Sequence, residues 1–573
     1  MRMLLFLLLL GPQMPLAQRS SPAPARTSRA VIDRDLTDVS VDRLHALYRE
    51  HRYTVAQVVQ WHLDRIARYN GIYQAVQTVT AKAALAEAAR EDAEAKQRGF
   101  HPGPLWGVPI VTKANTSIAG LITTDGWIGF MLPGQELVAP RDATIAARLR
   151  AAGAILVGVT NMPDFAASDT TRSTAFGRTG NAYDARFSPG GSSGSTVTAV
   201  TANLAVLGNG TDTGNSIRMP VATSNLVGIL PTRGLVSIAG IAPLDWQLDN
   251  TGPIARNVAD AALALTVMAG EDPLDPATAG SQSQAQPGPY TQYLKPGALK
   301  GRRFGVPAFI LDGETPPFQG VCPNATPEQF AKVIKDSRTP LKPETRAAFM
   351  KAVEEIRAAG ATVLIDPQIL PDSFAIAASH ICTRPYIREG TEKFLSDFGP
   401  ARYHSAEEYR QAVGTPLPEV IIGGDKTGMS ETVDIQQTTL ESDPQAEANF
   451  LGPRRDVLGL YEAELARLHL DGFVYPASQM PPVDETMPQD GGVSGGPHSD
   501  TDWVNMLGVP AISIPAGFYP DGLPFGIEIS TRKWHDGDLI SWAYDYELHN
   551  HHRRPPVLVD RGLLPTATRP LEP

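Results

Sequence analysis

Two serine- and glycine-rich segments contain the side chains of this sequence that are best suited to covalent chemistry. Residues 188–195 read SPGGSSGS, and residues 210–218 read GTDTGNSIR. Glycine-rich turns hold backbone N–H groups where an anion can approach, and a serine hydroxyl becomes a nucleophile when a base lies beside it. Either segment alone could be a flexible linker or a tight turn. Because a stretch of helix and strand character joins them, we expect both to lie between core elements.

A lysine at the end of an apolar run is the candidate base. Residues 105–113 read LWGVPIVTK, so Lys113 closes the run. A lysine amine has a reference pKa of about 10.4, and it acts as a base near neutral pH only when its surroundings disfavour the ammonium form. Burial at the end of a strand would have that effect. The alternative interpretation is a surface lysine that caps the strand.

Together these three segments resemble the amidase signature family. Its members carry a GGSSGGS-like segment, a later GTDxGGSIR-like segment, and a lysine after an LxGxPxxxK-like strand. Ser192 and Ser216 occupy the serine positions and are 24 positions apart (216 minus 192), which is the usual spacing of the family. Further similarity covers nearly the whole chain after its N-terminal leader, in residues 161–164, 176–181, 228–236, 249–260, 508–518 and 522–529.

The resemblance implies an amidase with a Ser-Ser-Lys triad. In that mechanism Ser216 is the nucleophile, Ser192 relays a proton, and Lys113 is the base. The family also implies a cis peptide bond between Gly191 and Ser192. The resemblance further implies that the tetrahedral oxyanion is met by backbone N–H groups at a turn that leads into a helix, namely those of Thr213, Gly214, Asn215 and Ser216.

Two charged residues flank the nucleophile. Asp212 and Arg218 match family positions to which we assign a supporting role for the loop, and a plain ion pair in solvent is the alternative. Two departures from the family pattern stand nearby. Asn215 replaces a glycine; asparagine tolerates left-handed backbone angles, so we expect the loop to accept it and its side chain to narrow the site or contact substrate. Ala114 replaces a common aspartate, which removes a charge next to Lys113.

The remaining sequence predicts an α/β fold with a large mixed, twisted sheet and helices on both of its faces. Apolar residues at helical spacing fill residues 40–99, and a helical segment precedes an apolar strand twice, in 144–159 and 349–365. Further short strands are expected at 473–475, 511–514 and 525–529. We predict one amidase signature domain over residues 26–565, with a variable, substrate-lining region at about 271–465 and surface excursions at 271–340 and 482–496.

Composition and charge limit the possible partners. The chain has 573 residues and a net charge of -11, and it lacks a long basic run, so we predict no nucleic-acid partner.

Its first residues include Arg2, an apolar run at 4–10 and Ala17, which together predict a signal peptide and leader over residues 1–25 and an exported protein. That run is too short to span a bilayer, so we predict no stable membrane insertion. Cys322 and Cys382 either pair or stay as thiols.

Other functions fit less well. Residues 190–194 and 492–496 match GxSxG, the nucleophile motif of Ser-His-Asp esterases, but neither follows a buried strand. A histidine-rich stretch near the C-terminus reads better as a solvated helix end than as a metal site, so we predict no metal and no cofactor; it comprises His535, Asp536, His549, His551 and His552. A non-catalytic amide-binding relative would not need all three triad residues. The transamidating subunit that modifies charged transfer RNA shares the fold, but an exported, acidic chain would not meet that substrate.

The predicted substrate is a small-molecule or peptide amide. Ser195 and residues 202–204 are similar to those of amidases that act on peptide amides. Aryl amides, carbamates, nylon-type oligoamides and esters stay open, because the fold and the triad do not define the acyl pocket. The oligomeric state stays open as well.

Overall fold

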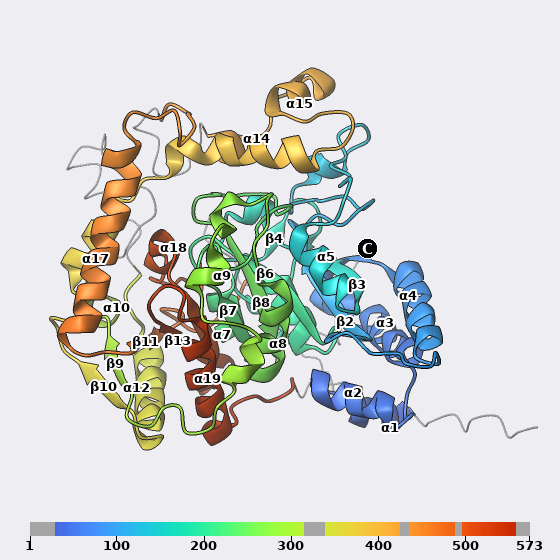
Figure 1. Cartoon of the computed structure of the whole chain (residues 1–573), viewed down its shortest axis with the longest axis horizontal. Coiled ribbons are helices and arrows are strands. Elements are labelled where there is room, and N and C mark those ends of the chain that lie inside the picture. Colours follow the sequence, from blue (N-terminus) through green and yellow to red (C-terminus); the bar gives the residue numbers. More distant parts are fainter. Residues whose placement is uncertain (1–28, 314–338, 424–434, 487–495, 557–573) are drawn as a thin grey trace, which may run out of the picture. The chain divides into compact units, whose positions relative to one another are not determined.

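The computed structural model describes residues 29–313, 339–423, 435–486 and 496–556 (Figure 1). Asp38–Pro573 form one compact unit, and Met1–Thr37 form a second, in which helix α1 (Arg29–Leu36) is the described element. The signal peptide predicted over residues 1–25 lies outside the described residues. None of the described helices combines the length and the apolar character that crossing a membrane requires.

An eleven-stranded mixed sheet forms the centre of the larger unit. Its strands are β1 (Val76–Val79), β2 (Val108–Lys113), β3 (Ala154–Thr160), β6 (Leu207–Asp212), β7 (Val227–Leu230), β8 (Asn250–Ala255), β9 (Arg303–Val306), β10 (Thr362–Ile365), β11 (Gly472–Pro476), β12 (Ala511–Phe518) and β13 (Pro524–Ser530). Their order is β1-β3-β2-β6-β8-β7-β12-β13-β11-β9-β10. β3, β2 and β6 are parallel, the middle of the sheet is antiparallel, and β11, β9 and β10 are parallel again. A two-stranded ribbon, β4 (Arg172–Ser173) with β5 (Gly177–Arg178), lies outside it.

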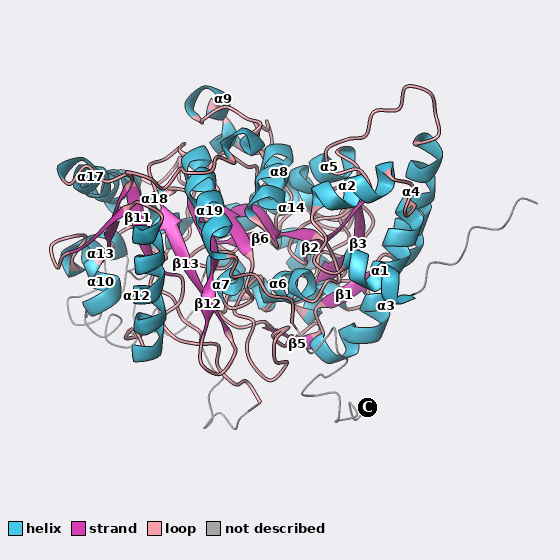
Figure 2. Cartoon of the chain, turned by 90° about the horizontal axis from the view of Figure 1, so that it is seen from below, coloured by secondary structure: helices cyan, strands magenta, loops and turns pink. Residues whose placement is uncertain are grey.

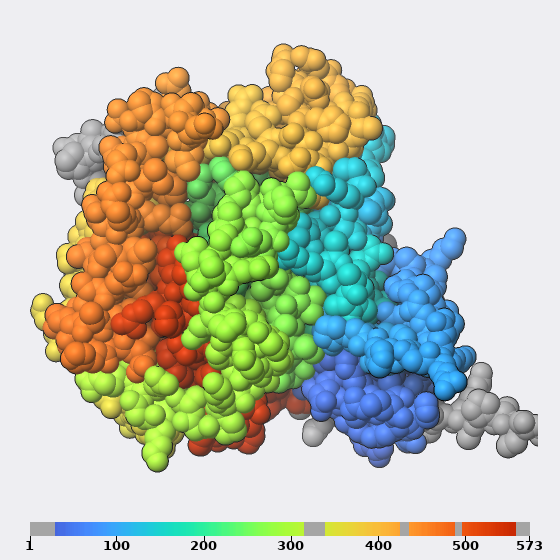
Figure 3. Space-filling model, viewed as in Figure 1, coloured from blue at the N-terminus to red at the C-terminus, as the bar shows by residue number. Residues whose placement is uncertain are grey.

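Helices cover both faces of the sheet (Figure 2). In this view α8 and α19 lie above the strands, and α6 and α7 lie below them. The helices of the larger unit are α2 (Val41–Arg49), α3 (Val55–Tyr73), α4 (Ala81–Glu94), α5 (Thr144–Ala151), α6 (Gly194–Thr201), α7 (Arg218–Ala222), α8 (Val258–Met268), α9 (Ser281–Gln284), α10 (Ala308–Asp312), α12 (Pro343–Ala358), α13 (Asp372–Ser379), α14 (Ile387–Phe398), α15 (Ala406–Val413), α16 (Glu419–Ile422), α17 (Gly452–Arg467), α18 (Trp503–Leu507) and α19 (Asp536–Asn550). The surface in Figure 3 places the C-terminal residues, in red, between segments of the middle of the chain. The predicted α/β fold with a mixed sheet is therefore confirmed.

Local sequence explains where these helices begin. At α3 the Thr54 hydroxyl accepts from the backbone N–H of Gln57, and the Gln57 side chain accepts from the Thr54 N–H, which is a complete capping box. At α8 the Asn257 side chain accepts from the N–H of Asp260. Both residues precede an apolar run whose buried face packs on the sheet.

The middle of the chain is more structured than its composition indicates. Residues 271–340 were expected to be a surface excursion, but they include β9, whose Phe304 is fully buried between β10 and β11. A four-residue strand with a charged first residue is too short to stand out against the surrounding proline and glycine. Strand β1 was likewise missed within the segment expected to be helical. Cys382 is buried, and Cys322 lies outside the described residues.

Candidate active site

The topology brings the two chemical segments to the same edge of the sheet as the lysine. Lys113 is the last residue of β2, and Asp212 is the last residue of its parallel neighbour β6. Because parallel strands end at the same edge, the loop after β6, which carries Ser216, starts close to the lysine. Helix α6 packs on both strands, and its N-terminal end carries the Ser192 segment.

Lys113 is fully buried and surrounded by hydroxyl groups. Its Nζ lies 2.6 Å from Ser192 Oγ, 3.1 Å from Ser193 Oγ and 2.8 Å from Thr211 Oγ1. Burial lowers the pKa of Lys113 to about 7, against the opposing effects of buried carboxyl groups in the neighbourhood. The amine is thus poised to take a proton near neutral pH, and the interpretation of Lys113 as a surface cap is wrong.

Ser192 contacts the lysine, and its neighbour Ser193 contacts the loop that carries Ser216. The peptide bond between Gly191 and Ser192 is cis, as expected. A Cβ on Gly191 would lie 2.4 Å from the Thr170 carbonyl oxygen, so the packed turn requires glycine there. The Ser193 N–H donates to the Ser216 carbonyl at 3.2 Å, which joins the two segments directly. Both catalytic candidates are described, and no hydrogen bond connects their hydroxyls in this state; such contacts often form only with substrate bound.

The loop after β6 presents unused backbone donors. Among the described residues, no protein acceptor pairs with the N–H groups of Gly214, Asn215 and Ser216. The Thr213 hydroxyl donates to Asp249 at 2.6 Å, which fixes the start of the loop. Helix α7 begins at Arg218 and has five residues, so its dipole is small. The free donors, rather than the helix, can therefore stabilise an oxyanion here.

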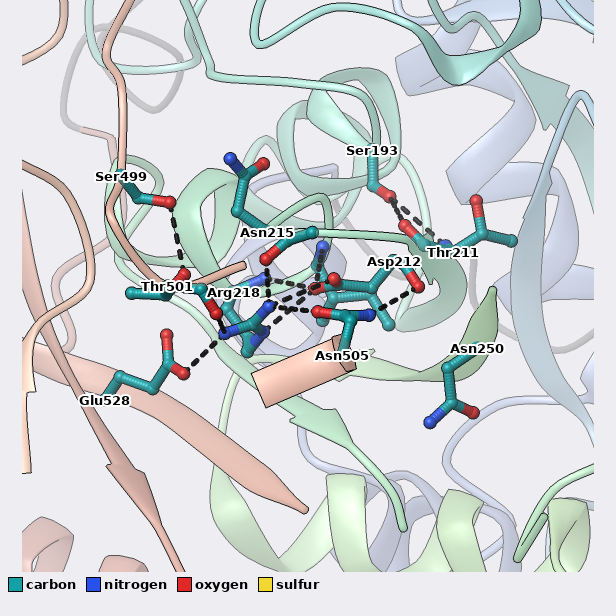
Figure 4. A network of polar contacts seen from close by, with 12 residues as sticks. Ser193, Thr211, Asp212, Asn215, Arg218, Asn250, Ser499, Thr501, Asn505 and Glu528 are labelled. Carbon is teal, nitrogen blue, oxygen red and sulfur yellow. Dashed lines mark hydrogen bonds and ion pairs between the residues drawn. The ribbon is translucent and has the colours of Figure 1, made fainter. Parts of the chain in front are cut away.

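A buried charge network holds this loop from below (Figure 4). Arg218 Nε donates to Asp212 at 3.1 Å, and its Nη1 donates to Glu528 at 2.6 Å, with all three side chains inaccessible to solvent. Arg218 also donates to the Gly214 carbonyl and to Asn505. The Asp212 carboxylate accepts in addition from the N–H of Ile217 at 2.8 Å. Asp212 and Arg218 thus support the loop, and the alternative of a solvent-exposed ion pair is wrong.

Comparison with known proteins identifies the family of the chain. A family model described as Amidase matches residues 57–326 and 324–540. The chain belongs to the amidase signature family.

Curated and solved members of the family resemble the chain over most of its length. A glutamyl-tRNA(Gln) amidotransferase subunit from Synechococcus sp. (strain JA-2-3B'a(2-13)) is 31% identical over 550 residues, covering 90% of this chain and 93% of the relative. The corresponding subunit from Moorella thermoacetica is 33% identical over 505 residues, covering 87% and 93%. The peptide amidase from Stenotrophomonas maltophilia is 29% identical and superposes with a TM-score of 0.70, covering 90% and 98%. A bacterial aryl acylamidase is 22% identical, superposes with a TM-score of 0.69 and shares the fold. The match covers 94% of this chain and 100% of the acylamidase chain.

This amidase signature protein accommodates its two unusual residues differently from what the sequence predicts. Asn215 does not adopt a positive φ angle, so left-handed tolerance is not the reason that the loop accepts it. Its carboxamide instead donates to Asp169 at 3.1 Å. Near Ala114, the N–H of the buried Asp125 donates to the Ala114 carbonyl at 3.2 Å, and among the neighbouring carboxyl groups Asp125 has the largest opposing effect on the lowered pKa of Lys113.

The described residues bear on two of the alternative sites. No strand leads directly into the 190–194 turn, so it is not an esterase elbow, and most of residues 492–496 lies outside the described residues. The histidines near the C-terminus have protein partners: His535 bonds Asp538, His549 lies against the Asp545 carbonyl, and His552 bonds Glu355. Within the described ranges, no group of three or more His, Cys, Asp or Glu side chains is arranged to hold a metal ion.

Sequence reasoning missed several residues that shape the site. Glu528 had a visible signal, because it is the only charge inside the apolar strand β13 and a charge there needs a buried partner. Thr211 and Ser193 lie next to recognised motif residues, but their contacts with the lysine could be read only in three dimensions. Asp169 and His498 are 329 positions apart, and nothing local connects them.

Proposed function

We propose that this protein is an amidase that hydrolyses a carboxamide C–N bond through an acyl-enzyme on Ser216. The observation that carries the proposal is the buried Lys113 Nζ at 2.6 Å from Ser192 Oγ, beside a loop with free N–H donors. Side-chain burial supports the order of the relay. Lys113 and Ser192 are fully buried, whereas Ser216 keeps 8% of its surface accessible, so substrate reaches Ser216 first.

The proposed reaction proceeds in two halves. Ser216 Oγ attacks the amide carbonyl carbon while its proton passes to Ser192 Oγ and the Ser192 proton passes to neutral Lys113. The N–H groups of the nucleophile loop stabilise the oxyanion. The C–N bond breaks as the same relay returns a proton to the leaving nitrogen, which departs as an amine or ammonia. Water then attacks the ester, the relay takes its proton, and the carboxylic acid and free Ser216 are released.

The proposed substrate class is a small-molecule or peptide amide, with esters and carbamates as side substrates of the same site. The structural similarity to a peptide amidase at 29% identity supports this class. No cofactor enters the proposal, because the relay and the donors of the loop supply each proton transfer and the charge stabilisation. A non-catalytic amide-binding role would leave a buried, pKa-shifted lysine without a use.

The test is hydrolysis of a panel of primary, secondary and aryl amides by the wild type and by three variants, Ser216→Ala, Ser192→Ala and Lys113→Ala. We expect kcat to fall by about 10³-fold or more in each variant, because the three residues would act as one unit and the loss of any one of them disables the relay. Lys82→Ala, at an exposed position of α4 and outside the predicted substrate-lining region, is the control and should keep wild-type activity. Unchanged turnover by Ser216→Ala would remove the assignment.

A second candidate function has support from the relatives. Those at 31% and 33% identity are named as subunits of a glutamyl-tRNA(Gln) amidotransferase. For this chain the corresponding activity would be release of ammonia from glutamine and its transfer to glutamyl-tRNA. The net charge of -11 disfavours transfer RNA as a partner. Glutamine hydrolysis stimulated by added glutamyl-tRNA, with little turnover of other amides, would favour this second function.

We also propose that the protein is exported after removal of a leader of about 25 residues. The support is the charged, then apolar, then small-residue pattern of its first residues. Expression of the full chain, cell fractionation and N-terminal sequencing of the mature product test it. A product that keeps its first residues and stays with the cell interior would refute export without affecting the catalytic proposal.

A further inference from the structure

The residue before the nucleophile is tied by its side chain to two distant parts of the chain. Asn215 Nδ2 donates to Asp169 Oδ1 at 3.1 Å, and Asp169 Oδ2 lies 3.0 Å from His498 Nδ1. Asp169 belongs to the loop after the short helix η2 (Asp164–Ala166), and His498 belongs to the loop before α18. Three separate segments therefore meet at the carboxylate of Asp169.

We propose that Asp169 and His498 are positioning residues that hold the oxyanion loop through the side chain of Asn215. The inference rests on the proposed function, because it concerns the donors that would meet the oxyanion. The backbone N–H of Asn215 is one of the unpaired donors, so the placement of its side chain controls the direction of a group used in the reaction. A glycine at this position would have no such tether.

Besides the bonds to Ser193 and Asp249 described above, two hydrogen bonds hold the loop on the side of Arg218. Arg218 donates to the Gly214 carbonyl, and the Asn215 carbonyl accepts from the Met219 N–H at 3.0 Å. In Figure 4 the Asn215 carboxamide points away from the Arg218 guanidinium, so the bond to Asp169 restrains the loop from the opposite side. Oxyanion donors work because they are fixed before the reaction, and small displacements of such groups are costly in rate.

The charges around Asp169 favour a hydrogen bond between His498 and the Asp169 carboxylate. The Asp169 carboxylate raises the pKa of His498, and the second carboxyl that faces the ring, Asp500, acts in the same direction. A protonated ring donates to Asp169 and leaves its other carboxylate oxygen for Asn215. Asp502 also lies within electrostatic range of Asp169, and burial raises the pKa of the Asp502 carboxyl well above its usual value.

A double-mutant cycle tests the tether, with the amide that the wild type turns over fastest as the probe. We expect Asp169→Ala to lower kcat about tenfold and to change KM less than twofold, because the loss falls on the transition state. In an Asn215→Gly background the same change should alter kcat less than twofold, since the tether is already absent. Ser168→Ala, in the same loop but bonded to Thr170, is the control and should leave kcat unchanged.

An inhibitor-binding measurement and a more conservative variant distinguish loss of the tether from misfolding. Phenylboronic acid, which would form a tetrahedral adduct on Ser216, should bind about tenfold more weakly to Asp169→Ala, while KM for the amide stays near the wild-type value. Should Asp169→Ala fail to fold, Asp169→Asn serves instead, with a kcat loss of about threefold that again vanishes in the Asn215→Gly background. An equal loss in both backgrounds, or none in the wild type, overturns the tether. Activity that survives Ser216→Ala would instead overturn the proposed function.

Discussion

The pH dependence of kcat/KM reports directly on the proposed base. Since burial lowers the pKa of Lys113 to about 7, the amine is neutral above that pH and protonated below it. Activity should therefore rise with pH and level off above about pH 7.5. Two units below its pKa only about one-hundredth of a base is neutral, so kcat/KM at pH 5 should be about 100-fold below the plateau.

The part of the kcat/KM profile that rises with pH is its acid limb. Removing one hydrogen-bond partner of the lysine should move the midpoint of this limb in a known direction. Thr211 Oγ1 accepts from Lys113 Nζ at 2.8 Å, and the ammonium form gains more from that bond than the neutral amine does. A hydrogen bond to a charged group contributes about 1.5–3 kcal/mol, and about 1.4 kcal/mol corresponds to one pKa unit. In the nearly isosteric Thr211→Val variant, the acid limb should shift by about one unit toward lower pH.

The assay is initial-rate hydrolysis of one neutral amide between pH 4.5 and 9 in buffers of constant ionic strength. A neutral substrate is needed so that the free-enzyme ionisation governs kcat/KM. Thr78→Val, an equivalent change in the partly exposed edge strand β1, is the matched control and should keep the wild-type pH profile. Two results would refute the assignment of Lys113 as the base. One is an acid limb of the wild type with its midpoint above pH 9, and the other is a midpoint that Thr211→Val shifts to higher pH.

Three changes away from the reacting groups test the architecture. Arg218→Met leaves Glu528 buried without its partner and should lower the free energy of unfolding by about 3–5 kcal/mol in urea titrations. Gly252→Ala would place a Cβ 1.9 Å from the Ile229 carbonyl oxygen in the middle of the sheet, so thermal denaturation should show a large loss of Tm or no folded protein. Thr54→Ala removes a helix cap and should cost about 1 kcal/mol of stability while kcat stays unchanged.

The candidate reacting groups of this site could be selected from the sequence because each lies in a short motif. Lys113 ends an apolar run, and that run is β2 with six buried residues. Two glycines of these segments lie in close contacts: a Cβ on Gly191 would lie 2.4 Å from the Thr170 carbonyl oxygen, and a Cβ on Gly210 would lie 2.8 Å from the Ile217 side chain. Strands of four to seven buried residues with flanking turns, such as β13, were also predictable from local composition.

The parts that sequence could not predict depend on distant contacts. The sheet order places β7 beside β12, nearly 300 positions apart, and no local pattern encodes that pairing. The effect of the Asp125 carboxyl on the pKa of Lys113 and the hydrogen bond from Asn215 to Asp169 each join residues of separate loops, so no local pattern indicates them. Both depend on the way the fold brings these loops together.

The graded burial of the three proposed catalytic side chains explains how a lysine can take the place of the usual histidine. An exposed lysine keeps a pKa near 10.4 and would be almost fully protonated at neutral pH. Lys113 is fully buried, as is Ser192; desolvation there lowers the pKa of Lys113 to about 7, and substrate cannot reach the amine. A hydroxyl group, that of Ser192, is then required to pass the proton between the buried amine and the more accessible Ser216. On this reasoning the second serine is a consequence of using a buried lysine as the base.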